Sequence, residues 1–396
     1  MTLPIKRVCP HLPNPEHVRL RDEESERLPR VIMPSGVPAW ALTRHEDIRA
    51  MLTDPRFSSD RTDPGFPTTV KNAQQSVGIL KKMMISMDSP EHGPARRAVI
   101  SEFTVKRMAS LKPRIQQIVD EHIDAMLAGP RPVDLVQALS LPVPSLVICE
   151  LLGVPYADHE FFQERTKVMV NRESSGERRR TAIQELASYL HDLVTEKERD
   201  EPDDLLGRQI RKQREDGEVD HEDLVSLAFL LLLAGHETTA NMISLGTYSL
   251  LENPEQLASI KADPTKTPDA VEELLRYFTI VDFALSRVAR EDAEIAGVKI
   301  KAGEGVVALS HTANHDPEVF DDPDTLNLER GARHHVAFGF GPHQCLGQNL
   351  ARMELQIVFD TLFARIPGLK LAEPADKLPF KDDANIYGLY QLPVTW

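Results

Sequence analysis

The tightest structural constraint in this sequence is the stretch Phe338-Gly339-Phe340-Gly341-Pro342-His343-Gln344-Cys345-Leu346-Gly347. Its glycines and proline specify a turn with a closely defined backbone, and apolar residues at helical spacing follow it. Cys345 is therefore expected just before a helix N-terminus, where the helix dipole and free N–H groups lower the pKa of a thiol. Such donors would also tune how much electron density the sulfur gives a metal. The alternative is a buried structural cysteine, which the ordered glycines and Phe338 disfavour.

A second polar segment, Ala234 to Thr239, interrupts a long apolar helix that is expected to start at the cap Asp220 and to run through Leu251. An acid and two hydroxyls are costly inside a buried helix unless they are used or satisfied. Thr238 can donate to the carbonyl oxygen of Ala234, which would bend the helix and open a groove. The alternative is that the helix reaches the surface here and that Glu237 is simply solvated.

A third segment, Glu272 to Arg276, places Glu273 and Arg276 three residues apart, so that they can pair on one face of a helix. Surface pairs of this kind are common and contribute little on their own. The weight of this pair comes from its position between the acid–threonine segment and the cysteine loop.

In this order the three segments resemble the cytochrome P450 superfamily over nearly the whole chain. Its cysteine motif, Phe-x-x-Gly-x-x-x-Cys-x-Gly, is matched by Phe338, Gly341, Cys345 and Gly347. Its acid–alcohol motif is matched by Ala234, Gly235, Glu237 and Thr238. Its structural pair is matched by Glu273 and Arg276, with the third member expected at Arg330. The resemblance implies a mainly α (α+β) fold, with a large helical region, a smaller β-rich region, and haem between a long central helix and the cysteine loop.

Residues 58–61, 87–92 and 346–352 are similar to the soluble actinobacterial class I type of this superfamily, whose members oxidise macrolides and other polyketides, terpenoids, sterol-like compounds and drugs. The resemblance implies haem b with its iron on Cys345. It implies further cofactor contacts at His92, Arg96, Ala234, Arg287, His343 and Gly347. Two propionates in an apolar fold need several cationic donors, and His92 and Arg96 share a helix face.

The activity implied is a monooxygenase that hydroxylates a lipophilic molecule, with Glu237 and Thr238 delivering protons to O2 as it is reduced. No Gly-x-Gly-x-x-Gly fingerprint is present, so electrons are expected from a ferredoxin with its ferredoxin reductase. Plausible basic contacts for that partner are Arg96, Arg97, Arg107, Lys112 and Arg352. The substrate pocket is expected to be lined by the loop 57–87 and by Leu230, Leu233, Ala234, Val281, Phe283 and Ile386.

Three alternatives stay open at this point. The same fold supports epoxidation, oxidative coupling or the use of peroxide. A haem-binding sensor without turnover has little need for the acid–threonine pair. A zinc protein using Cys345 with His334, His335 and His343 lacks a second cysteine at ligand spacing.

Composition narrows the class of protein. The 396 residues carry a net charge of −15, which argues against a nucleic-acid binder. Three cysteines favour a reducing compartment over a disulfide framework. Residues 1–15 do not form a signal peptide, and the apolar run 227–234 is too short to span a bilayer, so a cytoplasmic monomer is expected.

The pattern of elements predicts a single domain over 1–396. Helices dominate its middle. Strands are expected as a hairpin at 30–43, at 295–300 and 306–309, and as a ribbon at 386–396. Ser89, Asn253 and Thr267, each followed by proline, are expected to cap helices.

Overall fold

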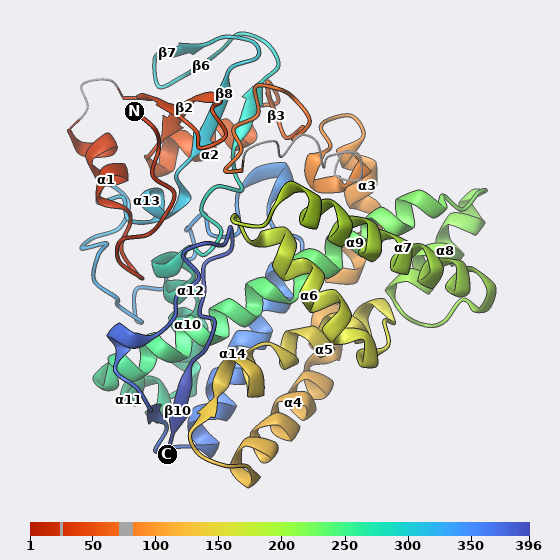
Figure 1. The fold of residues 1–396 in the computed structure, drawn as a ribbon, viewed down its shortest axis with the longest axis vertical. Coiled ribbons are helices and arrows are strands. Elements are labelled where there is room, and N and C mark those ends of the chain that lie inside the picture. Colours follow the sequence, from red (N-terminus) through yellow and green to blue (C-terminus); the bar gives the residue numbers. More distant parts are fainter. Residues whose placement is uncertain (24–26, 71–81) are drawn as a thin grey trace.

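The computed structural model describes residues 1–23, 27–70 and 82–396. Most strands lie at one end of the molecule, a smaller group lies at the opposite end near the C-terminus, and helices fill much of the space between them (Figure 1). The helices are α1 (Pro15–Asp22), α2 (His45–Thr53), α3 (His92–Val99), α4 (Val105–Ala128), α5 (Pro142–Leu152), α6 (His159–Val170), α7 (Gly176–Asp200), α8 (Leu205–Asp216), α9 (His221–Gly235), α10 (Glu237–Glu252), α11 (Pro254–Ala262), α12 (Thr267–Phe278), α13 (Ser310–Asn314) and α14 (Gln348–Arg365). The strands are β1 (Arg30–Ile32), β2 (Pro38–Leu42), β3 (Phe57–Ser58), β4 (Val133–Asp134), β5 (Arg287–Ala289), β6 (Ala293–Ile295), β7 (Val298–Ile300), β8 (Gly305–Ala308), β9 (Lys370–Leu371) and β10 (Pro393–Thr395).

The main sheet has the strand order β1-β2-β8-β5-β3. β1 and β2 form the antiparallel hairpin expected at 30–43. β2 then pairs in parallel with β8, so the start of the chain is joined to its last third. A second sheet, β4-β10-β9, lies at the C-terminus, and β6 and β7 form a separate ribbon.

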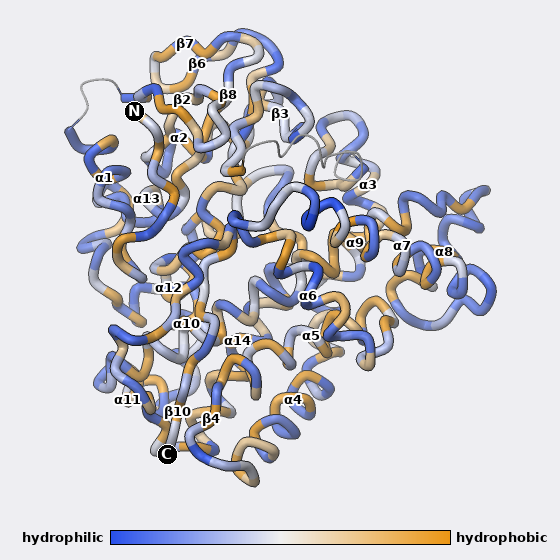
Figure 2. The backbone as a smooth tube through the Cα atoms, in the orientation of Figure 1, coloured by the Kyte–Doolittle hydropathy of each residue, from blue (hydrophilic) through white to orange (hydrophobic). Residues whose placement is uncertain are grey.

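The helical region packs around α10, which is buried along most of its length and contacts α5, α12 and α14. Its neighbours are amphipathic. α4 buries Ile115, Ile118 and Ile123 on one side, and Figure 2 shows it alternating between apolar and polar turns. The mainly α architecture with a smaller β-rich region is therefore confirmed.

The long apolar helix is broken where the polar segment begins. α9 ends at Gly235 and α10 begins at Glu237, with His236 between them. Asp220 caps α9 as expected, because its side chain accepts from the N–H of Asp223. The prediction of one helix through Leu251 is thus corrected to two helices with a break at the acid–threonine segment.

Two of the predicted helix caps, Ser89 and Thr267, were wrong in position, while Asn253 occupies the cap position before Pro254 as predicted but does not cap with its side chain. Asn253 stands at the start of α11, but its amide donates back to the carbonyl of Ser249 at 2.8 Å. The Thr267 hydroxyl donates to Asp360 at 2.6 Å and lies inside α12. α3 begins at His92, three residues after Ser89.

Two strand predictions need adjustment. The stretch 295–300 belongs to two strands, because Ala296 and Gly297 adopt positive φ angles of 50° and 82° and turn the chain between β6 and β7. Of the expected ribbon 386–396, only β10 is a regular strand. Within the expected loop 57–87 the structure shows β3 and a short 3₁₀ turn at Met84–Ser86, and residues 71–81 lie outside the described residues.

Candidate haem site

The cysteine loop is closed by its own backbone. The N–H of Cys345 donates to the carbonyl of Phe338 at 2.8 Å. Gly339 and Gly341 have φ angles of 70° and 72°, which favour glycine. A Cβ on Gly341 would also lie 2.8 Å from the carbonyl oxygen of Leu52. These constraints fix Cys345 directly before α14, as the sequence predicts.

The thiol of Cys345 does not have the low pKa expected from its place before a helix. Burial raises its pKa, although the N–H groups of Gly347 and Gln348 and the charges of Arg96 and Arg352 act in the opposite direction. The lowering contributions are present, but desolvation outweighs them in the protein alone. A metal ion bound to the sulfur would displace the proton outright.

Four of the expected cofactor ligands meet beside this loop. The rings of His92 on α3 and His343 stack with centroids 3.9 Å apart. Arg96, one turn after His92, donates to the carbonyl of Gln344 at 2.6 Å. Arg287 on β5 is buried, and burial together with the charge of Arg61 lowers its pKa to about 10. Among the described residues, none of these four groups forms an ion pair with a carboxylate, so together they suit the two carboxylates of a cofactor.

The acid–threonine segment forms the predicted bend. The Thr238 hydroxyl donates to the carbonyl of Ala234 at 2.8 Å. Ala234 is exposed although Leu230 and Leu231 before it are buried. His236 is fully buried, with Nδ1 2.8 Å from the carbonyl of Leu232 and Nε2 3.0 Å from the hydroxyl of Thr166 on α6.

Glu237 is not solvated. Its side chain is buried, and Oε2 accepts from Nζ of Lys381 at 3.0 Å and from the amide of Asn241 at 3.4 Å. Burial would raise the pKa of Glu237, but the charges of Lys381 and His236 overcome it and hold that pKa below its usual value. Lys381 was missed from the sequence, because nothing in its surroundings there links it to a residue 144 positions away.

The Glu273–Arg276 pair is completely buried, with Nε of Arg276 2.8 Å from Oε2 of Glu273, so it is not a surface pair. Oε1 of Glu273 also accepts from Nε of Arg330 at 3.1 Å and from the N–H of Asn327 at 3.0 Å. Nη1 of Arg276 donates to the carbonyl of Asn314 at 2.7 Å. The predicted triad is therefore present, and it joins α12 to the segment that leads into the cysteine loop.

Comparison with known proteins decides the family. The Cytochrome P450 family model matches residues 28–263 and 265–371. The chain belongs to the cytochrome P450 family. It is 50% identical to pentalenic acid synthase of Streptomyces avermitilis, over 100% of this chain and 97% of that protein. It is 47% identical to vitamin D3 dihydroxylase of Streptomyces griseolus, over 99% and 96%. The crystal structure of cytochrome P450 MoxA (CYP105) from Nonomuraea recticatena superposes with a TM-score of 0.92 at 61% identity, covering 100% of this chain and 98% of that one.

Cytochromes P450 are haem-thiolate monooxygenases, and this protein is one of them. The residues present fit the haem. The donor cluster lacks carboxylate partners within the described part of the chain, and an added Cβ at Gly347 would meet no protein atom, so packing does not explain that glycine. The zinc alternative finds no support, since no group of three or more His, Cys, Asp or Glu among the described residues could hold a metal ion.

The expected pocket residues of this P450 fall in two places. Leu230, Leu233, Val281 and Ile386 belong to or pack against the main apolar cluster around α9 and α10. Phe283 instead packs against the N-terminal cluster and meets the ring of His17 edge-on. Ala234, the penultimate residue of α9, is exposed.

The expected basic contacts of this P450 also divide. Arg352 pairs with Glu272 at 3.0 Å, and Arg96 donates to the cysteine loop, so both are engaged inside the protein. Arg97 on α3 and Lys112 on α4 are exposed. Arg107 is half-buried, with its Nε 3.8 Å from a carboxylate oxygen of Glu102.

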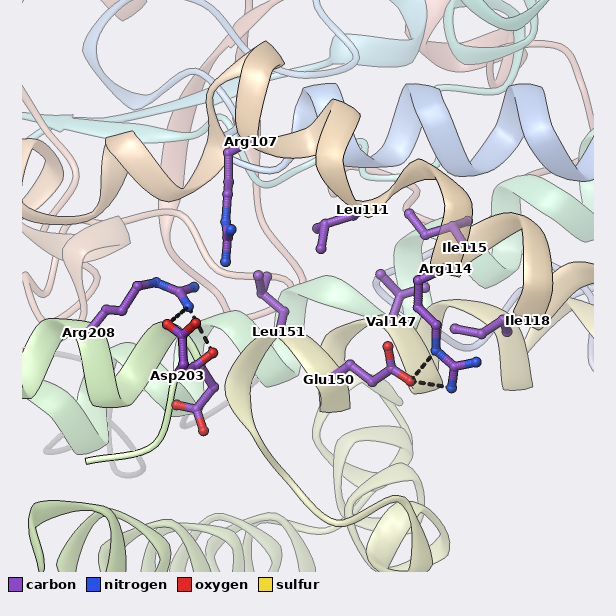
Figure 3. Close-up of a pocket in the computed structure, with 11 residues that line it drawn as sticks. Arg107, Leu111, Arg114, Ile115, Ile118, Val147, Glu150, Leu151, Asp203 and Arg208 are labelled. Carbon is purple, nitrogen blue, oxygen red and sulfur yellow. Dashed lines mark hydrogen bonds and ion pairs between the residues drawn. The ribbon is translucent and has the colours of Figure 1, made fainter. Parts of the chain in front are cut away.

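A separate hollow of about 170 Å³ lies between α4, α5 and α8 (Figure 3). Its charges are already paired, Arg114 with Glu150 and Arg208 with Asp203. It is smaller than most small-molecule sites, which hold about 300–1,000 Å³. Arg107, an expected contact of the redox partner, lines it, and none of the predicted haem, proton-delivery or substrate residues does.

One helix, His221–Glu252 taken through its break, is long and apolar enough to cross a membrane by composition alone among the described residues. Its apolar window is 61% buried inside this protein. That burial is expected of the central helix of a globular core.

Proposed function

We propose that the protein is a ferredoxin-dependent P450 that hydroxylates a lipophilic natural product of the polyketide or macrolide, terpenoid or sterol-like kind. The observation that carries the proposal is the presence of two sites: the cysteine loop beside two histidines and two arginines that form no ion pair with a described carboxylate, and the bent acid–threonine helix. Cys345 would bind the haem iron, and His92, Arg96, Arg287 and His343 would bind the propionates. Ala234 and Gly347 would lie against the macrocycle.

When bound, the haem supplies the activation of O2 with two electrons. The protein must bring two protons to that site without admitting bulk water. The Thr238 hydroxyl, which now donates to the carbonyl of Ala234, is the proton carrier next to the exposed stretch of helix. Glu237 is the acid one residue away, and Lys381 keeps it ionised and turned toward the C-terminal segment. Proton transfer therefore requires Glu237 to leave or share its contact with Lys381.

The substrate class rests on the apolar side chains near the bend, Leu230, Leu233, Val281 and Ile386. Apolar linings with few polar groups select lipophilic ligands. Two similar proteins are named for pentalenic acid and for vitamin D3, which agrees with small organic substrates. We further propose that the chain is a single domain over 1–396 and that it acts as a cytoplasmic monomer.

Reconstitution with a bacterial ferredoxin, its reductase and NADPH tests this function. Candidate lipophilic compounds would first be screened by the spin-state shift of the haem, and products would then be analysed by mass spectrometry. Addition of one oxygen atom to a C–H bond supports hydroxylation. Epoxide or coupled products would show that the enzyme performs epoxidation or oxidative coupling and not hydroxylation. Absence of electron transfer from any ferredoxin would favour a haem-binding sensor without turnover.

Thr238→Ala should uncouple electron use from product formation, because the hydroxyl next to the reaction site is lost. We expect the ratio of product to NADPH consumed to fall roughly a hundredfold, the lower end of the contribution of a positioned proton donor. Ser244→Ala is the matched control, since its hydroxyl makes the same bond to the carbonyl four residues back, to Ala240 at 3.1 Å. Equal coupling in the Thr238 variant and the control would contradict the role of Thr238.

Lys381→Met should shift the pH dependence of coupling upward. Without the ammonium group, burial prevails and the pKa of Glu237 rises above its usual value. In the wild type the lowered pKa keeps Glu237 ionised down to low pH. When the Lys381 ammonium is removed, Glu237 becomes protonated at a higher pH, so the acidic side of the curve of coupling against pH moves toward neutrality. Coupling measured from pH 5 to 8 checks this, and Lys381→Arg, which keeps the charge, should retain the original profile. An unchanged profile in Lys381→Met would show that Lys381 does not set the charge of Glu237.

A further inference from the structure

Arg61 is a half-buried residue whose guanidinium Nε is shielded from solvent, and the proposed function leaves it unused. Within the described part of the chain, its Nε has no hydrogen-bond partner, Nη2 lies 3.4 Å from the carbonyl oxygen of Ala284, and the guanidinium lies 5.6 Å from the centroid of the Phe66 ring. Burial lowers the pKa of Arg61, and no acidic residue among those described counteracts this. A guanidinium removed from water without an anion is costly, so a chain normally supplies one.

Two other arginines shielded from solvent have an anion within the protein: Arg276 pairs with Glu273, and the half-buried Arg208 pairs with Glu102. Arg287, which is buried in the donor cluster, shares with Arg61 the lack of a described carboxylate partner. Arg61 forms no ion pair with a carboxylate of the described residues. Of the two segments that the structure does not describe, 71–81 contains no Asp or Glu in its sequence, whereas 24–26 contains Glu24 and Glu26.

The surroundings of Arg61 place it between the donor cluster and the expected substrate pocket. Two residues before it, the Ser59 hydroxyl lies 3.1 Å from Nε2 of His343. The positive charge of Arg61 also acts on Arg287. On its other side, Ala284 belongs to the segment after α12 that holds Val281 and Phe283.

The backbone around Arg61 is held rigidly. Asp88 accepts from the N–H of Ser59 at 2.8 Å, and Asp60 accepts from the N–H of Thr62 at 2.8 Å. A Cβ on Gly65 would lie 2.1 Å from the carbonyl oxygen of Gly303, so this loop is packed directly against the sheet. A cation on a fixed backbone is a pre-organised binding group.

We propose that Arg61 binds a carboxylate inside the haem cavity, contributed either by a haem propionate or by an acidic lipophilic substrate. This inference rests on the proposed position of the haem. A planar guanidinium with an unused Nε–H and Nη–H offers two parallel donors, the geometry that suits a carboxylate. Esters and amides of the same ligand carry no negative charge, so we expect Arg61 to contribute less to their binding affinity.

The test compares Arg61→Gln, Arg61→Lys and the surface control Arg97→Gln as holoenzymes. The first measurement is the rate of haem transfer to apomyoglobin. The second is equilibrium binding of dodecanoic acid and of methyl dodecanoate, followed by the haem spectrum. Neither needs ferredoxin or turnover, so failure of the proposed hydroxylation leaves both readouts intact.

If Arg61 holds a propionate, haem loss from Arg61→Gln should be about tenfold faster than from the control, the effect of one charge-assisted hydrogen bond. If it holds a substrate carboxylate, the wild type should prefer the acid over the ester by about tenfold, and Arg61→Gln should lose that preference. Arg61→Lys should keep part of either effect. Unchanged haem loss, together with no preference for the acid in the wild type, would overturn the proposal.

Discussion

Cys345→Ser should abolish the strongly red-shifted absorption band of the reduced, CO-bound protein and should reduce monooxygenase activity to background. A serine hydroxyl in this loop cannot supply the thiolate that pushes electron density onto the iron. The loop would survive the exchange, because it is held by the backbone bond from Cys345 to Phe338 and by Gly339 and Gly341 rather than by the sulfur. The expected loss is therefore chemical and not a loss of fold.

Cys149→Ser is the matched control for this experiment. Cys149 lies in the core on α5, and burial raises its pKa to about 12, so it has no thiolate character. We expect this variant to keep the CO band at its original wavelength. Retention of the band in Cys345→Ser, or its loss in Cys149→Ser with the fold intact, would contradict Cys345 as the ligand.

Glu273→Gln should destabilise the protein by about 3–5 kcal/mol, the usual cost of breaking a buried ion pair from one side. Glu273 and Arg276 have no solvent exposure, so neither charge can be rehydrated when its partner is removed. Arg330 would lose the same carboxylate, and it anchors the segment 321–325 through its remaining guanidinium bonds. Because that segment leads toward the cysteine loop, haem content should fall with stability.

Glu329→Gln provides the comparison at the surface. Glu329 pairs with Lys266, but the two side chains are 67% and 40% exposed. Such pairs contribute about 0–1 kcal/mol. Urea unfolding followed by circular dichroism measures both variants. A loss in Glu273→Gln no larger than in Glu329→Gln would show that the buried triad does not stabilise the fold.

The sequence was most informative where the interacting residues are close together in the chain. The cysteine loop, the back-bond from Thr238 to Ala234 and the Glu273–Arg276 spacing each follow from local geometry, and the structure has all three. The cap predicted at Thr267 failed for the opposite reason, because its hydroxyl donates to Asp360, which is 93 residues away in the sequence. Asn253 instead donates to the carbonyl of Ser249 four residues back, a local bond that competes with capping.

The electrostatics of the site could not be read from the sequence. Glu237 meets Lys381 only because the C-terminal segment folds back over α10, and Arg61 nears Arg287 only through the pairing of β3 with β5. The thiol pKa of Cys345 likewise depends on burial, which overrides the helix dipole that the pattern suggested. The pKa values of Glu237 and Arg287 depend on contacts between residues more than a hundred positions apart. Local sequence spacing does not predict such contacts.

The parallel pairing of β2 with β8 has a consequence for synthesis on the ribosome. Trp40 in β2 lies opposite Val306 in β8, so the hairpin made first must wait for about 260 further residues before its neighbour exists. At about 5–20 residues per second that interval is roughly 10–50 s. During it the free edge of β2 is open to pairing with other chains. The nascent protein therefore carries an unprotected strand through most of its translation, and slower elongation would lengthen the period in which chaperones must cover it.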